Sequence, residues 1–171
     1  VLHNKIYTIQ FCMDQNPEAG YVLAVDHPLC HWTSDERRYI KSELKKRFSA
    51  QEGPLLIMFN GMFDLRIIRR QLHIPIIWLP VWEITAGEHL LDENIVDLRN
   101  FGAKPGNLRA IFCSYQNDHY CNADFTKEDR ATTGTTDPRD KAFLTYASMD
   151  VVLSLAMKTE QIKRAAKIKI V

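Results

Sequence analysis

Residues 54–64 read PLLIMFNGMFD and contain the change of pattern on which the predicted architecture depends. The continuous apolar run of residues 54–59 is bounded by Gly53 on one side and by Asn60-Gly61 on the other, which is typical of a buried central strand. The next residues carry apolar side chains at helical spacing as far as Leu72. We therefore predict a strand, a tight turn and a helix, which places Asp64 near the carboxyl end of the strand.

The segment before this unit predicts a strand hairpin followed by a helix. Residues 5–13, KIYTIQFCM, alternate apolar and polar side chains, and residues 20–26, GYVLAVD, follow them after a turn-forming stretch. Thr33 and Glu36 have the spacing of a capping box, and the following residues repeat apolar side chains every four positions among basic ones. We expect an antiparallel hairpin and an amphipathic helix with a basic outer face.

The segment after this unit is predicted to be mainly helical. The sequence IPIIWL, residues 74–79, suggests a further short strand, and two helices are predicted from ITAGEHLLDEN and NLRAIFCSY. Residues 117–138 are polar and predict a surface loop. Asp137 and Pro138 have the properties of an N-cap and a first helical residue, so we expect a long helix from there to about residue 168.

The whole chain, residues 1–171, is expected to form one domain. It is 46% hydrophobic, and no internal repeat or change of composition divides it. Strands that alternate with helices predict the α/β class, with a mixed β-sheet flanked by helices.

Composition restricts the partners and the compartment. The formal net charge of +1 gives no overall attraction to a polyanion, so a nucleic acid would have to be held by local patches or by metal ions. The four cysteines show no disulfide framework, which favours reduced thiols and a cytoplasmic location. Cys113, His119 and Cys121 offer three zinc ligands but lack the paired spacing of a zinc site. No apolar run is long enough to predict a membrane span.

Two short segments carry the candidate chemistry. The first is Asn60 to Asp64, with Phe63 directly before the aspartate. The second lies in the last helix, where Tyr146 and Asp150 are four residues apart and so share one helix face. A carboxylate in a mostly apolar helical stretch is costly to bury unless it is paired or binds a metal. Either segment alone is more often structural than functional, because such short motifs are common by chance.

With these two motifs in this order, the chain resembles the 3′→5′ exonuclease domain of family-A DNA polymerases, particularly the phage-type enzymes, within the DEDDy exonuclease superfamily. Asn60 to Asp64 is similar to the second motif of that family, and Tyr146 to Asp150 is similar to the third, Tyr-x-x-x-Asp. The resemblance extends over nearly the whole chain and is most specific in YASMDVVLSLAMKTEQ. It implies a ribonuclease H-like fold and hydrolysis of phosphodiester bonds at single-stranded DNA 3′ ends.

The resemblance also implies roles for individual residues. Asp64 and Asp150 are expected to bind two divalent metal ions, Mg²⁺ or Mn²⁺, and Tyr146 to orient the attacking water. Asn60 is expected to contact the DNA or to brace the turn before Asp64. Phe63 is placed with the substrate-contacting residues, although core packing is the alternative that its pattern favours. Arg66 and Arg70 are expected to contact phosphates, with a solvated helix face as the alternative.

The first motif of the family, Asp-x-Glu, is absent from these residues. Asp14 and Glu18 lie in the hairpin turn with the wrong spacing. Because the chain starts with Val1 and enters a strand pattern almost at once, we expect the fold to be incomplete at its N-terminus and the polymerase domain to belong to the same parent chain. An isolated fragment would then cut weakly.

Two alternatives to a proofreading domain remain open. One is a stand-alone DEDDy nuclease, including an enzyme that trims RNA as ribonuclease D does. The other is a module that keeps the exonuclease fold without the chemistry and serves DNA binding or scaffolding.

Overall fold

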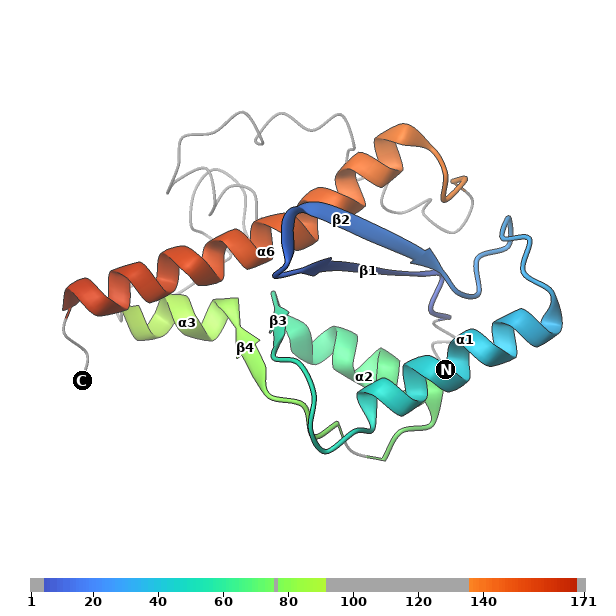
Figure 1. The fold of residues 1–171 in the computed structure, drawn as a ribbon, viewed down its shortest axis with the longest axis horizontal. Coiled ribbons are helices and arrows are strands. Elements are labelled where there is room, and N and C mark those ends of the chain that lie inside the picture. The colour runs from blue at the N-terminus through green and yellow to red at the C-terminus, as the bar shows by residue number, and fades with distance from the viewer. Residues whose placement is uncertain (1–4, 76, 92–135, 169–171) are drawn as a thin grey trace.

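The structure is a computed structural model that describes residues 5–75, 77–91 and 136–168. It confirms the α/β class. The described elements, in chain order, are β1 (Thr8–Met13), β2 (Asn16–Ala24), α1 (Ser34–Phe48), β3 (Leu56–Met58), α2 (Gly61–Leu72), β4 (Val81–Glu83), α3 (Ile84–Leu91) and α6 (Lys141–Ile168) (Figure 1).

Strands β1 and β2 form the predicted antiparallel hairpin. Ile9 is paired with Leu23 and Phe11 with Tyr21, and the rings of Phe11 and Tyr21 stack with their centres 5.3 Å apart. Such cross-strand pairs are the side-chain contacts that stabilise a two-stranded ribbon.

Strands β3 and β4 form a separate parallel pair, in which Met58 is the partner of Glu83. The predicted strand at residues 74–79 is wrong, because β4 begins only after Pro80. The Ile74 N–H instead donates to the Arg69 carbonyl at 2.9 Å and closes the end of α2, so it is not available to a strand ladder.

The expected single mixed sheet is not found within the described residues, whose strands form two sheets of two strands each. The reason lies at the strand edges. In this part of the chain, β1 pairs only with β2 and β3 pairs only with β4, so the second edge of β1 and of β3 carries no strand. Helix α6 contacts β1, β2 and β3 and so joins the two sheets by side-chain packing.

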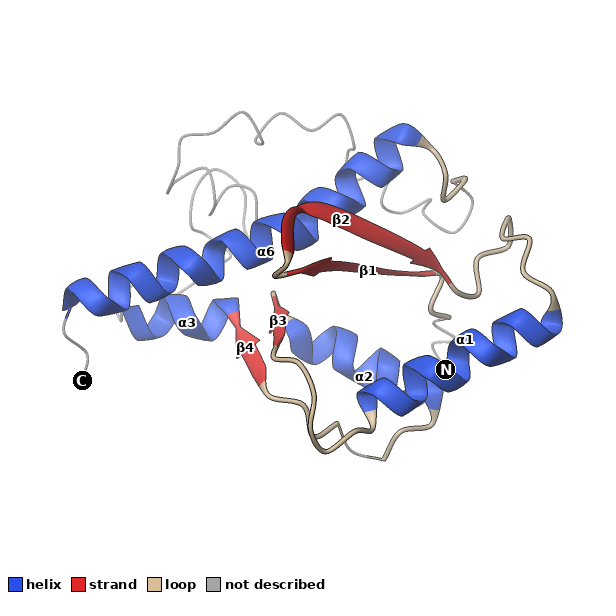
Figure 2. Cartoon of the chain, viewed as in Figure 1, coloured by secondary structure: helices blue, strands red, loops and turns tan. Residues whose placement is uncertain are grey.

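Helices cover the hairpin on both sides. Figure 2 shows α6 along one side of the hairpin and α1 and α2 on the other. On the α1 and α2 side, Ile6 and Val25 from the hairpin ends are buried with Ile68 and Leu72 of α2, and apolar residues of α1 pack against them. Burial of these side chains provides the main stabilisation of this half of the molecule.

Helix α1 begins as the sequence predicts. Thr33 accepts from the Glu36 N–H, and the Glu36 carboxylate accepts from the Thr33 N–H at 2.8 Å, which completes the capping box. The ammonium group of Lys41 lies 2.6 Å from the Asp26 carboxylate and links α1 to the end of β2.

Helix α6 begins later than predicted. It starts at Lys141, and the N-cap bond comes from Asp140, whose carboxylate accepts from the Phe143 N–H at 3.0 Å. Asp137 instead binds the guanidinium of Arg139 at 2.8 Å, and Pro138 lies in the turn before the helix. The predicted end of the helix at about residue 168 is confirmed.

A close backbone contact fixes α6 on the hairpin. A Cβ atom on Gly20 of β2 would lie 2.5 Å from the Cα atom of Ser148, and the Ser148 hydroxyl donates to the Gly20 carbonyl at 3.3 Å. Only a glycine permits this approach of helix and strand.

The other end of α6 is held by a buried polar group. Gln161 donates to the Ile84 carbonyl and to the Glu88 carboxylate, each at 2.8 Å, and accepts from the Trp82 indole N–H at 2.7 Å. Arg164 also binds the Glu88 carboxylate, at 3.1 Å. These bonds fix α6 against α3 and the end of β4.

Some predictions concern residues outside the described part of the chain. They are the helix NLRAIFCSY, nearly all of the loop at residues 117–138, and the group Cys113, His119 and Cys121. Among the helices that the structure does describe, none has the length and apolar character needed to cross a membrane.

Candidate functional site

The first candidate segment lies in a tight turn between β3 and α2, as predicted. Asn60 adopts the left-handed conformation, with φ 54° and ψ 40°, which asparagine tolerates better than most residues. Gly61 follows in close contact with β3, since a Cβ atom there would lie 2.6 Å from the Cβ of Met58. The Asn-Gly pair therefore lets the chain reverse and start the helix within two residues of the strand end.

Asp64 lies in the first turn of α2. The residue as a whole is exposed, but neighbouring atoms partly desolvate its carboxylate, and this desolvation raises the pKa of Asp64 above its ordinary value. A carboxylate whose negative charge is poorly solvated gains more than an ordinary one from a bound cation.

Phe63 does not pack in the core, so that alternative is wrong: the residue is 57% exposed. The helix begins at Gly61 and directs Ile68 and Leu72 inward, which leaves position 63 on the solvent side. An exposed ring next to Asp64 is available for stacking on a base.

Arg66 and Arg70 are both exposed and lie one helical turn apart on α2. With Arg69 and Ile74 they line a shallow hollow of about 240 Å³. Three guanidinium groups that follow an aspartate on one helix form a local positive surface, in a chain whose net charge is only +1.

Tyr146 and Asp150 are both half-buried in α6 and lie one helical turn apart. The backbone at Asp150 is regular, and its carbonyl also accepts from the Ser154 hydroxyl at 2.8 Å. Since α6 contacts β3, the helix that carries this pair packs against the strand that leads to Asn60 and Asp64.

The structure thus places the predicted residues on two elements. Asn60, Phe63 and Asp64 lie at the start of α2, with Arg66 and Arg70 further along it, while Tyr146 and Asp150 lie on α6. Within residues 5–75, 77–91 and 136–168, no three His, Cys, Asp or Glu side chains form a group that could hold a metal ion. The carboxylates of Asp64 and Asp150 are hard oxygen donors that suit Mg²⁺ or Mn²⁺, but further donors are needed to complete such a site.

Sequence reasoning missed one residue at this turn, Glu83. Its carboxylate accepts from the Asn60 N–H at 2.7 Å and from the Ala86 N–H at 2.7 Å. A weak signal was present, because Glu83 comes directly before the predicted helix ITAGEHLLDEN, although glutamate is not a preferred N-cap residue. The bond to Asn60, which is 23 residues away, had no local signal.

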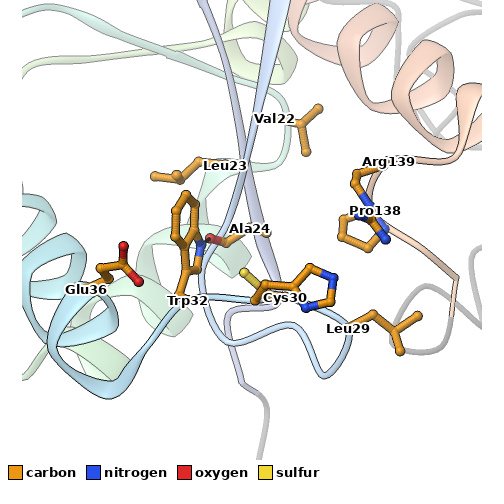
Figure 3. A pocket seen from close by; sticks show the side chains of 10 residues that line it. Val22, Leu23, Ala24, Leu29, Cys30, Trp32, Glu36, Pro138 and Arg139 are labelled. Atoms are coloured by element: carbon orange, nitrogen blue, oxygen red, sulfur yellow. Dashed lines mark hydrogen bonds between the residues drawn. The ribbon is translucent and has the colours of Figure 1, made fainter.

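A second hollow, of about 380 Å³, lies away from this turn. Figure 3 shows Pro138 and Arg139 on one side of it, with Leu29 below them, and Trp32 on the other side, beside Leu23 and Ala24 of β2. The Trp32 indole N–H is already bound to the Ala24 carbonyl at 2.8 Å, and Arg139 is held by Asp137. The lining is mainly apolar and includes neither Asp64 nor Asp150.

No protein-family model, no curated protein and no solved structure is significantly similar to this chain.

Proposed function

We propose that this chain is a 3′→5′ exonuclease domain with a ribonuclease H-like fold, and that it acts on single-stranded DNA ends as the proofreading part of a phage-like family-A DNA polymerase. The observation that carries the proposal is the position of the two motifs. Asp64 follows the carboxyl end of β3, and the helix that carries Tyr146 and Asp150 packs against the same strand. In open α/β sheets, ligands bind at the carboxyl ends of strands.

In this proposal Asp64 and Asp150 hold two divalent ions, Mg²⁺ or Mn²⁺. These ions would supply an activated water and stabilise the leaving oxygen. The raised pKa of Asp64 supports the assignment, because a cation relieves the poor solvation of its carboxylate. Further ligands would come from an Asp-x-Glu motif, which residues 1–171 do not contain.

Other side chains would position the substrate. Tyr146, one turn before Asp150, orients the attacking water with its hydroxyl. The water oxygen bonds to phosphorus as the bond from phosphorus to the 3′ oxygen breaks, which leaves a 3′-hydroxyl on the shortened strand and releases a nucleoside 5′-monophosphate. Phe63 stacks on a terminal base, and Arg66 and Arg70 bind phosphates, since all three side chains are exposed on α2.

The test is degradation of a 5′-labelled single-stranded DNA oligonucleotide with Mg²⁺ or Mn²⁺. The chain, and a longer form that includes any upstream Asp-x-Glu segment, is compared with its Asp64→Ala and Asp150→Ala variants. The control is Asp35→Ala, because Asp35 is exposed in the first turn of α1, a helix that carries neither motif. Shortening from the 3′ end that both site variants lose and the control retains supports the proposal. Absence of shortening in every form refutes it.

A second function is favoured by one observation. Phe63, Arg66 and Arg70 form an exposed aromatic and basic surface that could bind a nucleic acid without any metal. In that case the chain is a non-catalytic binding module. Binding of labelled single-stranded DNA in EDTA that weakens with salt and with Arg66→Ala, but shows no shortening when Mg²⁺ is added, is the result that would identify it. The same assay with an RNA strand separates a DNA enzyme from an RNA-trimming one.

A further inference from the structure

The turn before Asp64 is stabilised by a hydrogen bond from its backbone to Glu83, a residue of the neighbouring strand β4. Glu83 ends β4, whose register places it beside Met58, the last residue of β3. Its two carboxylate oxygens are used separately. One accepts from the Asn60 N–H and the other from the Ala86 N–H, each at 2.7 Å.

These two bonds have different purposes. Helix α3 starts at Ile84, so the bond to Ala86 is the N-cap bond of α3. The bond to Asn60 leaves this helix and crosses to the adjacent strand, where it supplies the acceptor for the backbone N–H of a residue at φ 54°. A left-handed asparagine costs about 1 kcal/mol of conformational free energy, and a bond from an ionised acceptor offsets that cost.

The choice of glutamate is informative. Aspartate is a preferred N-cap residue and glutamate is not, so capping of α3 alone does not explain Glu83. An aspartate is shorter by one carbon–carbon bond, about 1.5 Å, which is enough to take its carboxylate out of hydrogen-bonding range of the Asn60 N–H. Neighbouring strands lie about 4.8 Å apart, and only the longer side chain spans that gap while it caps its own helix.

We infer that Glu83 is a positioning residue for the candidate site: by binding the Asn60 N–H it fixes the turn, and through the turn the direction in which α2 presents Phe63 and Asp64. The activity part of this inference rests on the proposed exonuclease function. The geometric part does not, and it can be tested by itself.

The aspartate variant separates the two roles. Glu83→Asp keeps the charge and the cap of α3 but loses the bond to Asn60, whereas Glu83→Ala loses both. The matched control is Glu52→Gln, because Glu52 is exposed in the loop before β3. The melting temperature reports the loss of stability when the cap of α3 is removed. The rate of hydrogen exchange at the Asn60 amide, monitored by NMR, reports whether the bond from Asn60 to residue 83 is present.

We expect Glu83→Asp to lower the melting temperature by only about 2–4 °C, less than Glu83→Ala does, while the Asn60 amide exchanges about tenfold faster, the factor that corresponds to the loss of one ordinary hydrogen bond. On single-stranded DNA with Mn²⁺, kcat is expected to fall about tenfold or more with little change in DNA affinity, since the phosphate-binding arginines remain. Glu52→Gln should match the wild type in every measurement.

Unchanged exchange at Asn60 in Glu83→Asp would overturn the inference, whatever the enzyme does. Faster exchange with unchanged kcat would also overturn it, because the turn would then be held by Glu83 without any effect on the site. If the wild type shows no nuclease activity but the exchange result is as expected, the proposed function fails and the geometric role of Glu83 stands.

Discussion

Replacement of Gly20 by alanine should loosen the attachment of α6 to the hairpin. The added Cβ would lie 2.5 Å from both the Cα and the Cβ of Ser148 and 2.8 Å from its carbonyl oxygen. Two of these atoms belong to the helix backbone and cannot rotate away, so α6 has to shift. Overpacking of this kind costs about 1–3 kcal/mol, and loss of the bond from the Ser148 hydroxyl adds about 0.5–1 kcal/mol. The smaller entropy of the unfolded alanine chain offsets about 0.5 kcal/mol.

The expected net loss is about 2 kcal/mol, which lowers the urea midpoint by about 1 M for a chain of this size. Equilibrium unfolding in urea, monitored by circular dichroism, measures this shift of the midpoint. Gly53→Ala is the matched control, because its new Cβ would meet only the end of the flexible Leu79 side chain. Ser148→Ala removes the hydrogen bond alone and should cost less than half as much. If Gly20→Ala unfolds at the same urea concentration as Gly53→Ala, the close packing of α6 on β2 is refuted.

Three further predictions concern single residues. Without metal, Asp64→Asn should be slightly more stable than the wild type at pH 7 and equally stable at acid pH. The pKa of Asp64 is raised in the folded state, so the wild type loses stability as the pH rises from the unfolded-state pKa to the folded-state pKa. Urea unfolding at both pH values checks this, and a variant less stable than the wild type at pH 7 contradicts it. Asn60→Ala should lower the free energy of unfolding by about 1 kcal/mol, whereas Asn60→Gly should not lower it, because alanine is disfavoured at φ 54° and glycine is not. Equal melting temperatures for the two variants would refute the left-handed turn. Gln161→Leu should lower the free energy of unfolding by about 2–4 kcal/mol, because it removes three hydrogen bonds of a buried side chain. A decrease of less than about 1 kcal/mol, measured by calorimetry, would contradict this.

Local patterns predicted the local structure. The alternation of residues 5–13, the capping box at Thr33 and the strand, turn and helix around Asn60 were all confirmed, because each depends on residues close together in the chain. The helical spacing of Tyr146 and Asp150 is likewise a property of one helix.

Features that depend on distant residues were not predictable in this way. The exposure of Phe63 is decided by which face of α2 meets the hairpin, and the role of Glu83 depends on the register of β4 beside β3. The start of α6 was displaced because Asp137 pairs with Arg139, which leaves Asp140 to cap the helix. For Phe63 and Asp137 a tertiary or competing contact overrode a reasonable local signal, and for the bond from Glu83 to Asn60 there was no local signal to read.

The position of α6 also affects how the protein folds during its synthesis. This helix of 28 residues, about 42 Å long at 1.5 Å per residue, comes after every other described element in the chain, yet it is the element that packs against both sheets. On the ribosome, the hairpin and the β3–β4 pair emerge first, and no strand ladder joins them among the residues that the structure describes. Helix α2, which follows β3 directly, already packs Ile68 and Leu72 against the hairpin, so residues 141–168 add the packing of α6 on both sheets to a core that is partly assembled.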